Sequence, residues 1–248
     1  MTTQQHFRRG DCMALLKETP DQSVDIVITS PPYNQLGKRI PKRGAGIHKG
    51  NAFINKVGAV GYADDMEELD YQAWVRDVVR ECLRVSRGLV WINHKTRYRD
   101  KVGIHPLAFL GEFPLYAEVI WNRKISMALN SKRFAPCHEY VFGFGEPHYW
   151  DDSQNKLMSV WNIMPATGQT NHPCPFPETL VARLIHASCP PGGTVLDPFA
   201  GSGTVAAVAA KLGRHALGFD VSDQYLAGAE RRVARARMQA NFMEQLHA

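Results

Sequence analysis

The chain has 248 residues, of which 44% are apolar, enough to build one large domain with a sizeable core. No run approaches the roughly 18 uncharged apolar residues of a membrane span, and the first residues lack the apolar stretch of a signal peptide, so we expect a cytoplasmic protein without a membrane partner. The net charge of +5 and the pI of about 9.0 favour a polyanionic partner.

Apolar runs alternate along the chain with segments of helical periodicity, which is typical of βα units that form a mostly parallel sheet between helices. Strands are expected at 6–10, 24–29, 88–93, 116–122, 139–144, 194–197 and 215–220. Helices are clearest at 71–86 and 222–240, and the four arginines of the second helix are expected to face outward. The pattern predicts an α/β fold in a single domain spanning residues 1–248.

Two segments interrupt this alternation. Residues 35–62 hold six glycines and six lysines or arginines but no acidic residue, and a loop of this length usually signals function or disorder. We expect this segment to be a mobile basic loop. Residues 145–178 are rich in Pro, Asn, His and Trp and show no clear period.

The cysteines predict neither disulfides nor a metal site. The five of them, at positions 12, 82, 137, 174 and 189, form no CxxC pair, and their odd number argues against a disulfide framework. Cysteines and histidines gather between 137 and 174, but no two of them have the spacing of zinc ligands. We expect reduced thiols and no metal.

Residues 194–220, TVLDPFAGSGTVAAVAAKLGRHALGFD, predict a strand, a glycine turn, a helix and a second strand. Gly201 and Gly203 allow a ligand to approach the backbone closely, and the helix that begins at Thr204 offers free N–H groups to an anion. Asp220 ends the second strand, near the offset at which an acidic residue accepts hydrogen bonds from a ribose.

The same stretch argues against a dinucleotide. The GxGxxG fingerprint is missing, and Asp197, which precedes the glycines, would repel a pyrophosphate and attract an amino group. A ligand with an ammonium, a carboxylate and a ribose fits better. S-adenosylmethionine has this description.

A second motif, Ser30-Pro31-Pro32-Tyr33, follows the expected strand at 24–29. With the DPFAGSG motif behind it, the chain resembles the beta group of DNA amino methyltransferases, whose circularly permuted order places a catalytic (S/D/N)PP(Y/F) motif before the cofactor motif. RGDCMALLKETPDQSVDIVITSPPYN, FAPCHEYVFGF and HPCPFPETLVARLI are similar to other parts of that family. The resemblance implies a Rossmann-like, S-adenosylmethionine-dependent methyltransferase fold with seven strands, mostly parallel, and helices on both faces.

The resemblance also implies the cofactor site. Asp11 would meet the adenine, Asp197 the ammonium and Asp220 the ribose hydroxyls, and the glycine loop would line the methionine part. The complete expected set is Asp11, Cys12, Ser30, His172, Phe176, Asp197, Phe199, Gly201, Ser202, Gly203, Thr204 and Asp220.

The SPPY turn suits chemistry at an exocyclic amine, a poor nucleophile because its lone pair is delocalised into the ring. The Ser30 hydroxyl and the Pro31 carbonyl can accept the two amino hydrogens, and the fixed φ of the prolines, including Pro32, holds the acceptor in place. The base must first flip out of the duplex, and the Tyr33 ring can stack on it. Asn34 is expected to support the turn or the base edge.

We therefore expect a site-specific DNA methyltransferase that transfers a methyl group from S-adenosylmethionine to the amino group of a flipped base. The resemblance implies cytosine N4 as the target, since family members with a serine at the first motif position often methylate there, with adenine N6 as the alternative. An RNA or protein-glutamine methyltransferase and a non-catalytic DNA-binding relative are weaker rivals. A cytosine C5 enzyme is disfavoured, because neither Pro-Cys dipeptide, at 136–137 or at 173–174, stands where the permuted order places catalysis.

Double-stranded DNA is the expected partner, and a small target-recognition insertion is expected at about 123–172. The expected DNA-binding residues are Asn34, Lys38, Arg39, Lys42, Arg43, Arg123, Lys124, Lys132 and Arg133. No nuclease domain fits within this length, so a restriction endonuclease would be a separate chain. A homodimer stays open as a further assembly.

Overall fold

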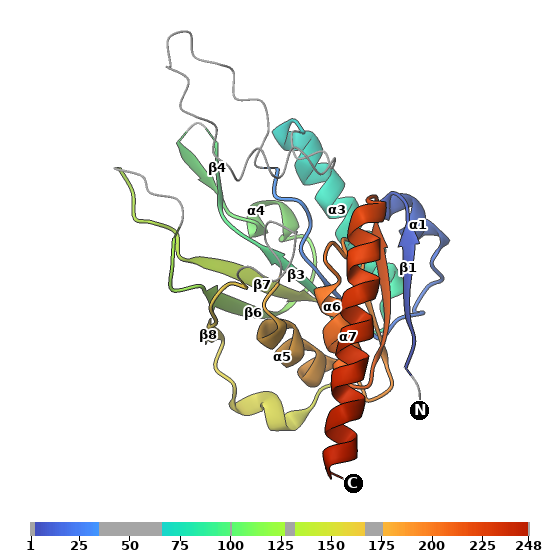
Figure 1. The fold of residues 1–248 in the computed structure, drawn as a ribbon. Coiled ribbons are helices and arrows are strands. Elements are labelled where there is room, and N and C mark those ends of the chain that lie inside the picture. Colours follow the sequence, from blue (N-terminus) through green and yellow to red (C-terminus); the bar gives the residue numbers. More distant parts are fainter. Residues whose placement is uncertain (1–2, 35–65, 100, 127–131, 167–175, 248) are drawn as a thin grey trace.

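A computed structural model describes residues 3–34, 66–99, 101–126, 132–166 and 176–247, without the side chains of 240–247. An eight-stranded sheet lies between two layers of helices (Figure 1). The fold is therefore the predicted α/β class. The basic loop expected at 35–62 lies outside the described residues.

The sheet contains all seven predicted strands, with boundaries shifted by up to two residues. Its strands are β1 (Gln5–Arg9), β2 (Ile26–Thr29), β3 (Val90–His94), β6 (Leu115–Asn122), β7 (His138–Phe144), β8 (Val160–Asn162), β9 (Thr194–Asp197) and β10 (His215–Asp220). The eighth strand, β8, was not predicted, because three residues are too few to show a period. A separate, unpredicted hairpin pairs β4 (Arg97–Arg99) with β5 (Val102–Ile104).

The sheet is mainly parallel, as predicted. Its strand order is β1-β10-β9-β2-β3-β7-β6-β8, and every pair from β1 to β3 is parallel. Strand β7 runs antiparallel to both of its neighbours, and β8 pairs in parallel with β6. Because β7 and β8 belong to this sheet, only the other parts of 123–172 are left to form a target-recognition insertion.

Helices cover both faces of the sheet. Because successive side chains of a strand point to opposite faces, a strand packs against both layers of helices. One face packs against α1 (Cys12–Glu18), α3 (Glu68–Val85) and α4 (Leu107–Leu110), the other against α5 (Glu178–Ser188), α6 (Thr204–Lys211) and α7 (Asp223–His247). A short 3-10 helix, η1 (Asp152–Lys156), precedes β8. In β2, Val27 faces the first layer, whereas Ile26 and Ile28 face the second. None of the helices in the described part of the chain combines the length and apolar character needed to span a membrane.

The connections reverse direction between β2 and β9. The chain leaves β2 through α3 to reach β3 on one side, and leaves β9 through α6 to reach β10 on the other. Open α/β sheets bind their ligands at such a switch point, beyond the carboxyl ends of the strands. Both sequence motifs begin there, because SPPY follows β2 and DPFAGSG starts at the last residue of β9.

Candidate functional site

The two motifs are in direct contact. Strands β2 and β9 are paired neighbours, with Val27 opposite Leu196. Two residues further along β2, the Thr29 hydroxyl donates a hydrogen bond to Asp197 Oδ1 across 2.6 Å, and both side chains are buried. The fold therefore joins segments about 170 residues apart at one point.

The SPPY turn is held from the side of α3 and the β4–β5 hairpin. Asn34 has a positive φ of 53°, which asparagine tolerates better than most residues. Asn34 is only 1% exposed; its Nδ2 donates to the Met66 carbonyl at 2.9 Å, while its backbone carbonyl accepts from Arg99. Of the two roles expected for Asn34, this placement favours support of the turn.

A buried histidine and tyrosine support the same turn. The Tyr71 hydroxyl lies 2.7 Å from the Pro32 carbonyl and 2.8 Å from His94 Nε2. Burial lowers the pKa of His94 to about 3, so its ring is neutral. All these groups are satisfied when the Lys95 N–H donates to His94 Nδ1, at 2.8 Å, His94 Nε2 donates to Tyr71, and Tyr71 donates to Pro32.

On the β7 side, the turn meets a cluster of oxygen atoms. The Tyr33 hydroxyl lies 2.8 Å from Asn93 Oδ1 and 3.1 Å from Glu139 Oε2, and it accepts from Ser30 Oγ at 2.9 Å. Neither Asn93 nor Glu139 was predicted from the sequence. A signal existed, since each lies in an expected strand or at its end, but only the sheet order places β3 beside β2 and β7 beside β3.

The DPFAGSG loop begins with a buried carboxylate. Asp197 is 5% exposed and accepts hydrogen bonds from Thr29 and from the Phe199 N–H, at 3.0 Å. Burial raises its pKa to about 7, and the nearby charge of Asp220 acts in the same direction. Within the described residues, no lysine or arginine forms an ion pair with Asp197. The site can therefore accept a positive charge.

Asp220 closes the other side of the loop. Its carboxylate accepts from the Gly201 N–H at 2.9 Å and from the Ser222 N–H at 2.8 Å, and burial raises its pKa. Gly203 has a φ of 71°, and a Cβ there would lie 2.5 Å from the Cβ of Ala229. A glycine is required at this position for both reasons.

An arginine of α7 orders the two hydroxyls of the loop. Arg232 Nη1 lies 2.7 Å from Thr204 Oγ1 and 3.2 Å from Ser202 Oγ, and Nη2 donates to Glu178, which Lys211 also contacts. A guanidinium can only donate, so both hydroxyl oxygens accept from Arg232. The two hydroxyls also lie 3.4 Å from each other, where one can donate to the other, so at least one of their protons remains available for a ligand. The prediction that Arg232 faces outward was wrong. Its side chain is 16% exposed.

Asp11 and Cys12, which also belong to the expected cofactor set, lie at the start of α1. Asp11 caps α1, with Oδ1 accepting from the Ala14 N–H at 3.0 Å. Cys12 is buried, which raises its pKa to about 12 and leaves it unreactive.

Two aromatic residues of that set lie near the core. The Phe199 ring packs edge-on against Trp74 at 5.6 Å, and Phe176 is partly buried on the α5 side. His172 lies outside the described residues.

Apart from Asn34, the expected DNA-binding residues divide into three groups: one paired internally, three exposed and four outside the described residues. Arg123 pairs internally, with Nη1 3.0 Å from Glu139 Oε1, whereas Lys124 and Lys132 are exposed. Arg133 is exposed and lies over the Tyr98 ring, 3.5 Å from its centroid. The four residues that the structure does not describe are Lys38, Arg39, Lys42 and Arg43.

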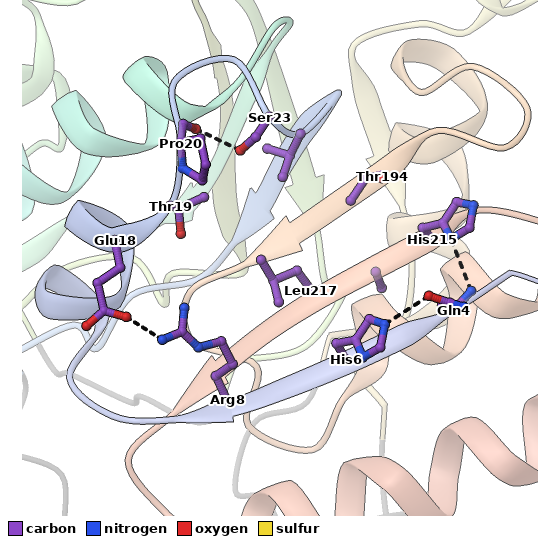
Figure 2. A pocket seen from close by; sticks show the side chains of 12 residues that line it. Gln4, His6, Arg8, Glu18, Thr19, Pro20, Ser23, Thr194, His215 and Leu217 are labelled. Carbon is purple, nitrogen blue, oxygen red and sulfur yellow. Dashed lines mark hydrogen bonds and ion pairs between the residues drawn. The ribbon is translucent and has the colours of Figure 1, made fainter.

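A surface pocket lies elsewhere, over the amino-terminal halves of β1, β9 and β10 (Figure 2). Gln4, His6, Thr194 and His215 line it, and Figure 2 shows Arg8 paired with Glu18 at its edge. It is at the opposite end of these strands from both motifs and contains no predicted site residue. The described residues also hold no group of three or more side chains suited to a metal ion.

A protein-family model matches most of the chain. The model described as a DNA methylase, N6_N4_Mtase, covers residues 24–231. Among curated proteins, the Type II methyltransferase M.BglII of Bacillus subtilis is 27% identical over 270 residues, covering 90% of this chain and 68% of that protein. The Type II methyltransferase M.HinfI of Haemophilus influenzae is 26% identical, with coverages of 96% and 70%.

Solved structures share the fold. PvuII DNA methyltransferase, described as cytosine-N4-specific, superposes with a TM-score of 0.69 at 17% identity, covering 97% of this chain and 93% of that one. A putative DNA modification methylase from Thermus thermophilus, TTHA0409, solved in complex with S-adenosyl-L-methionine, gives a TM-score of 0.65 at 24% identity, with coverages of 95% and 96%.

Proposed function

Since this chain belongs to the DNA methylase family, we propose that it transfers a methyl group from S-adenosylmethionine to the exocyclic amino group of a base flipped out of double-stranded DNA. One observation carries the proposal. The Thr29–Asp197 hydrogen bond places the SPPY turn beside the DPFAGSG loop at the switch point of the sheet. The order of the two motifs supports membership of the beta group.

The residues of the loop fit the proposed cofactor. Asp197 is a buried carboxylate that has no counter-charge among the described residues, which suits an ammonium group. Ser202 and Thr204 can donate to a carboxylate, and the partly exposed Asp220 can accept from ribose hydroxyls. S-adenosylmethionine would supply the methyl group, activated by its sulfonium.

The SPPY turn would prepare the amine. Ser30 Oγ and the Pro31 carbonyl accept its two hydrogens, which favours a tetrahedral nitrogen with a localised lone pair. The bond from Tyr71 to the Pro32 carbonyl and the bond from Asn34 to Met66 keep this turn rigid. Catalysis then consists mainly of positioning.

Cytosine N4 is the proposed target, because the first motif residue is a serine. Adenine N6 is the second candidate, since both bases present an amino group beside a ring nitrogen. We propose that the exposed Lys124, Lys132 and Arg133 contact the DNA backbone. A separate restriction endonuclease is proposed as a functional partner, in keeping with the Type II relatives.

Methyl incorporation into DNA tests this function. The protein, incubated with S-adenosylmethionine labelled in the methyl group and with DNA from a methylation-free host, should label the DNA. Ser30→Ala should lower the rate by about 100-fold to 1,000-fold, the usual effect of removing one catalytic hydrogen-bonding group. Ser23→Ala, at the far end of the sheet, should not change it. Equal rates for the Ser30 variant and the wild type would contradict the proposed mechanism.

A further inference from the structure

Glu139 is a buried carboxylate with two distinct partners. It is 6% exposed; Oε1 accepts from Arg123 at 3.0 Å, and Oε2 faces the Tyr33 hydroxyl at 3.1 Å. A carboxylate is costly to bury unless its oxygens receive hydrogen bonds. The ion pair with Arg123 offsets the cost of burying Oε1. The other oxygen is directed at the catalytic turn.

The hydrogen-bond directions around Tyr33 follow from counting protons. Asn93 Nδ2 donates to the Tyr140 carbonyl at 2.9 Å, so Asn93 Oδ1 is the atom that faces Tyr33. Among the described residues, the Tyr33 hydroxyl thus offers one proton to two acceptors, Asn93 Oδ1 and Glu139 Oε2. Ser30 Oγ is close enough to donate to Tyr33 Oη, at 2.9 Å, or to Asn93 Oδ1, at 3.5 Å.

In both arrangements, the proton of Ser30 points into this cluster. The lone pairs of Ser30 Oγ are then left for an amino group outside it, which is what acceptance from a base requires. An ionised carboxylate is a stronger acceptor than an amide, and donation from Tyr33 to Glu139 makes the Tyr33 oxygen a better acceptor for Ser30.

We infer that Glu139 is a positioning residue for the proposed methyl transfer: through the Tyr33 hydroxyl, it orients the Ser30 hydroxyl so that Ser30 Oγ accepts a hydrogen from the target amine. The inference rests on the proposed function. It differs from a purely structural role, in which Glu139 would only balance the charge of Arg123.

A double-mutant cycle separates the two roles. Glu139→Gln keeps the shape of the side chain and removes its charge, and Tyr33→Phe removes the hydroxyl. Each change should lower kcat about 10-fold to 100-fold with labelled S-adenosylmethionine and DNA from a methylation-free host, as expected for a displaced catalytic group. In the Tyr33→Phe background, Glu139→Gln should change kcat by no more than about twofold, because the two groups act in series.

Two further measurements exclude a folding defect. The affinity for S-adenosylmethionine, measured by calorimetry, should stay within about twofold of the wild type in the Glu139 and Tyr33 variants, since neither residue is expected to touch the cofactor. A second double-mutant cycle combines Glu139→Gln with Arg123→Gln. Urea unfolding of its variants measures the contribution of the ion pair to stability. The proposed role predicts that Glu139 is coupled to Tyr33 in kcat and to Arg123 only in stability.

Three outcomes would overturn the inference. The first is an unchanged kcat in Glu139→Gln. The second is multiplication of the two kcat losses in the variant changed at both Glu139 and Tyr33. The third is a Glu139 effect on kcat that disappears with Arg123→Gln but persists with Tyr33→Phe. A wild-type protein that labels no DNA would instead refute the proposed function, and the inference with it.

Discussion

Replacement of Asp197 by asparagine should flatten the pH dependence of stability in the ligand-free protein. The carboxyl is 5% exposed and lacks an ion-pair partner in the described part of the chain, so the fold disfavours its charged form. Asparagine keeps an oxygen that can accept from Thr29 and from the Phe199 N–H, and it cannot ionise.

The sign and size of the effect follow from the two pKa values. The pKa of Asp197 rises from 3.8 to about 7 on folding, so between these values the folded state holds a proton that the unfolded state has released. The free energy of unfolding therefore falls as pH increases through this window, and the whole loss is present above pH 7. A difference of roughly three units, at about 1.4 kcal/mol each, gives an upper value of about 4 kcal/mol.

Urea unfolding between pH 4.5 and 8 measures this contribution as the difference between the wild type and Asp197→Asn. The variant should gain stability relative to the wild type as the pH rises. Asp223→Asn, which removes an exposed carboxylate, is the control for net charge and should show no such trend. S-adenosylmethionine should bind the wild type more tightly as Asp197 ionises. Parallel stability curves for the wild type and Asp197→Asn would refute the role assigned to burial.

Two other changes test the loop itself. Arg232→Gln should weaken S-adenosylmethionine binding about tenfold, the value of one charge-assisted contact, but should leave the binding of 5′-methylthioadenosine, which lacks the carboxylate, unchanged. Calorimetry measures both affinities, with Arg231→Gln, which changes an exposed arginine, as the control. Equal losses of affinity for both ligands would contradict the role of Arg232. Gly203→Ala should lower the free energy of unfolding by about 1–3 kcal/mol more than Gly192→Ala, since both glycines have φ near +70° but only a Cβ at 203 would collide with Ala229. Thermal unfolding of the two variants compares them, and equal destabilisation would show that the collision is relieved.

The sequence predicted best where local signals agree. Strands β9 and β10 have the expected boundaries, and α6 begins at Thr204, because short apolar runs there are bounded by aspartates and glycines. A parallel sheet also brings the carboxyl ends of its strands to one edge, which places both motifs at that edge, but only the structure shows that β2 and β9 are neighbours. The site was therefore predictable as a pair of loops.

The supporting residues depend on tertiary structure. Asn93 and Glu139 meet Tyr33 only because β3 and β7 are neighbours in the sheet, which periodicity does not reveal. For Arg232, a local signal existed: it lies seven residues after the buried Tyr225, and so on the same side of α7. The prediction nevertheless placed Arg232 on the exposed side of the helix, because arginine is charged.

The chemistry of the modified base tests the proposed function most directly. The protein should be expressed in a methylation-free host, and the nucleosides of the host DNA identified by mass spectrometry, with the Ser30→Ala variant expressed in parallel. We expect N4-methylcytosine in the host DNA with the wild type and none with the variant. N6-methyladenine would correct the target base and leave the mechanism intact, whereas 5-methylcytosine, or no methylated base under active expression, would contradict the proposed function.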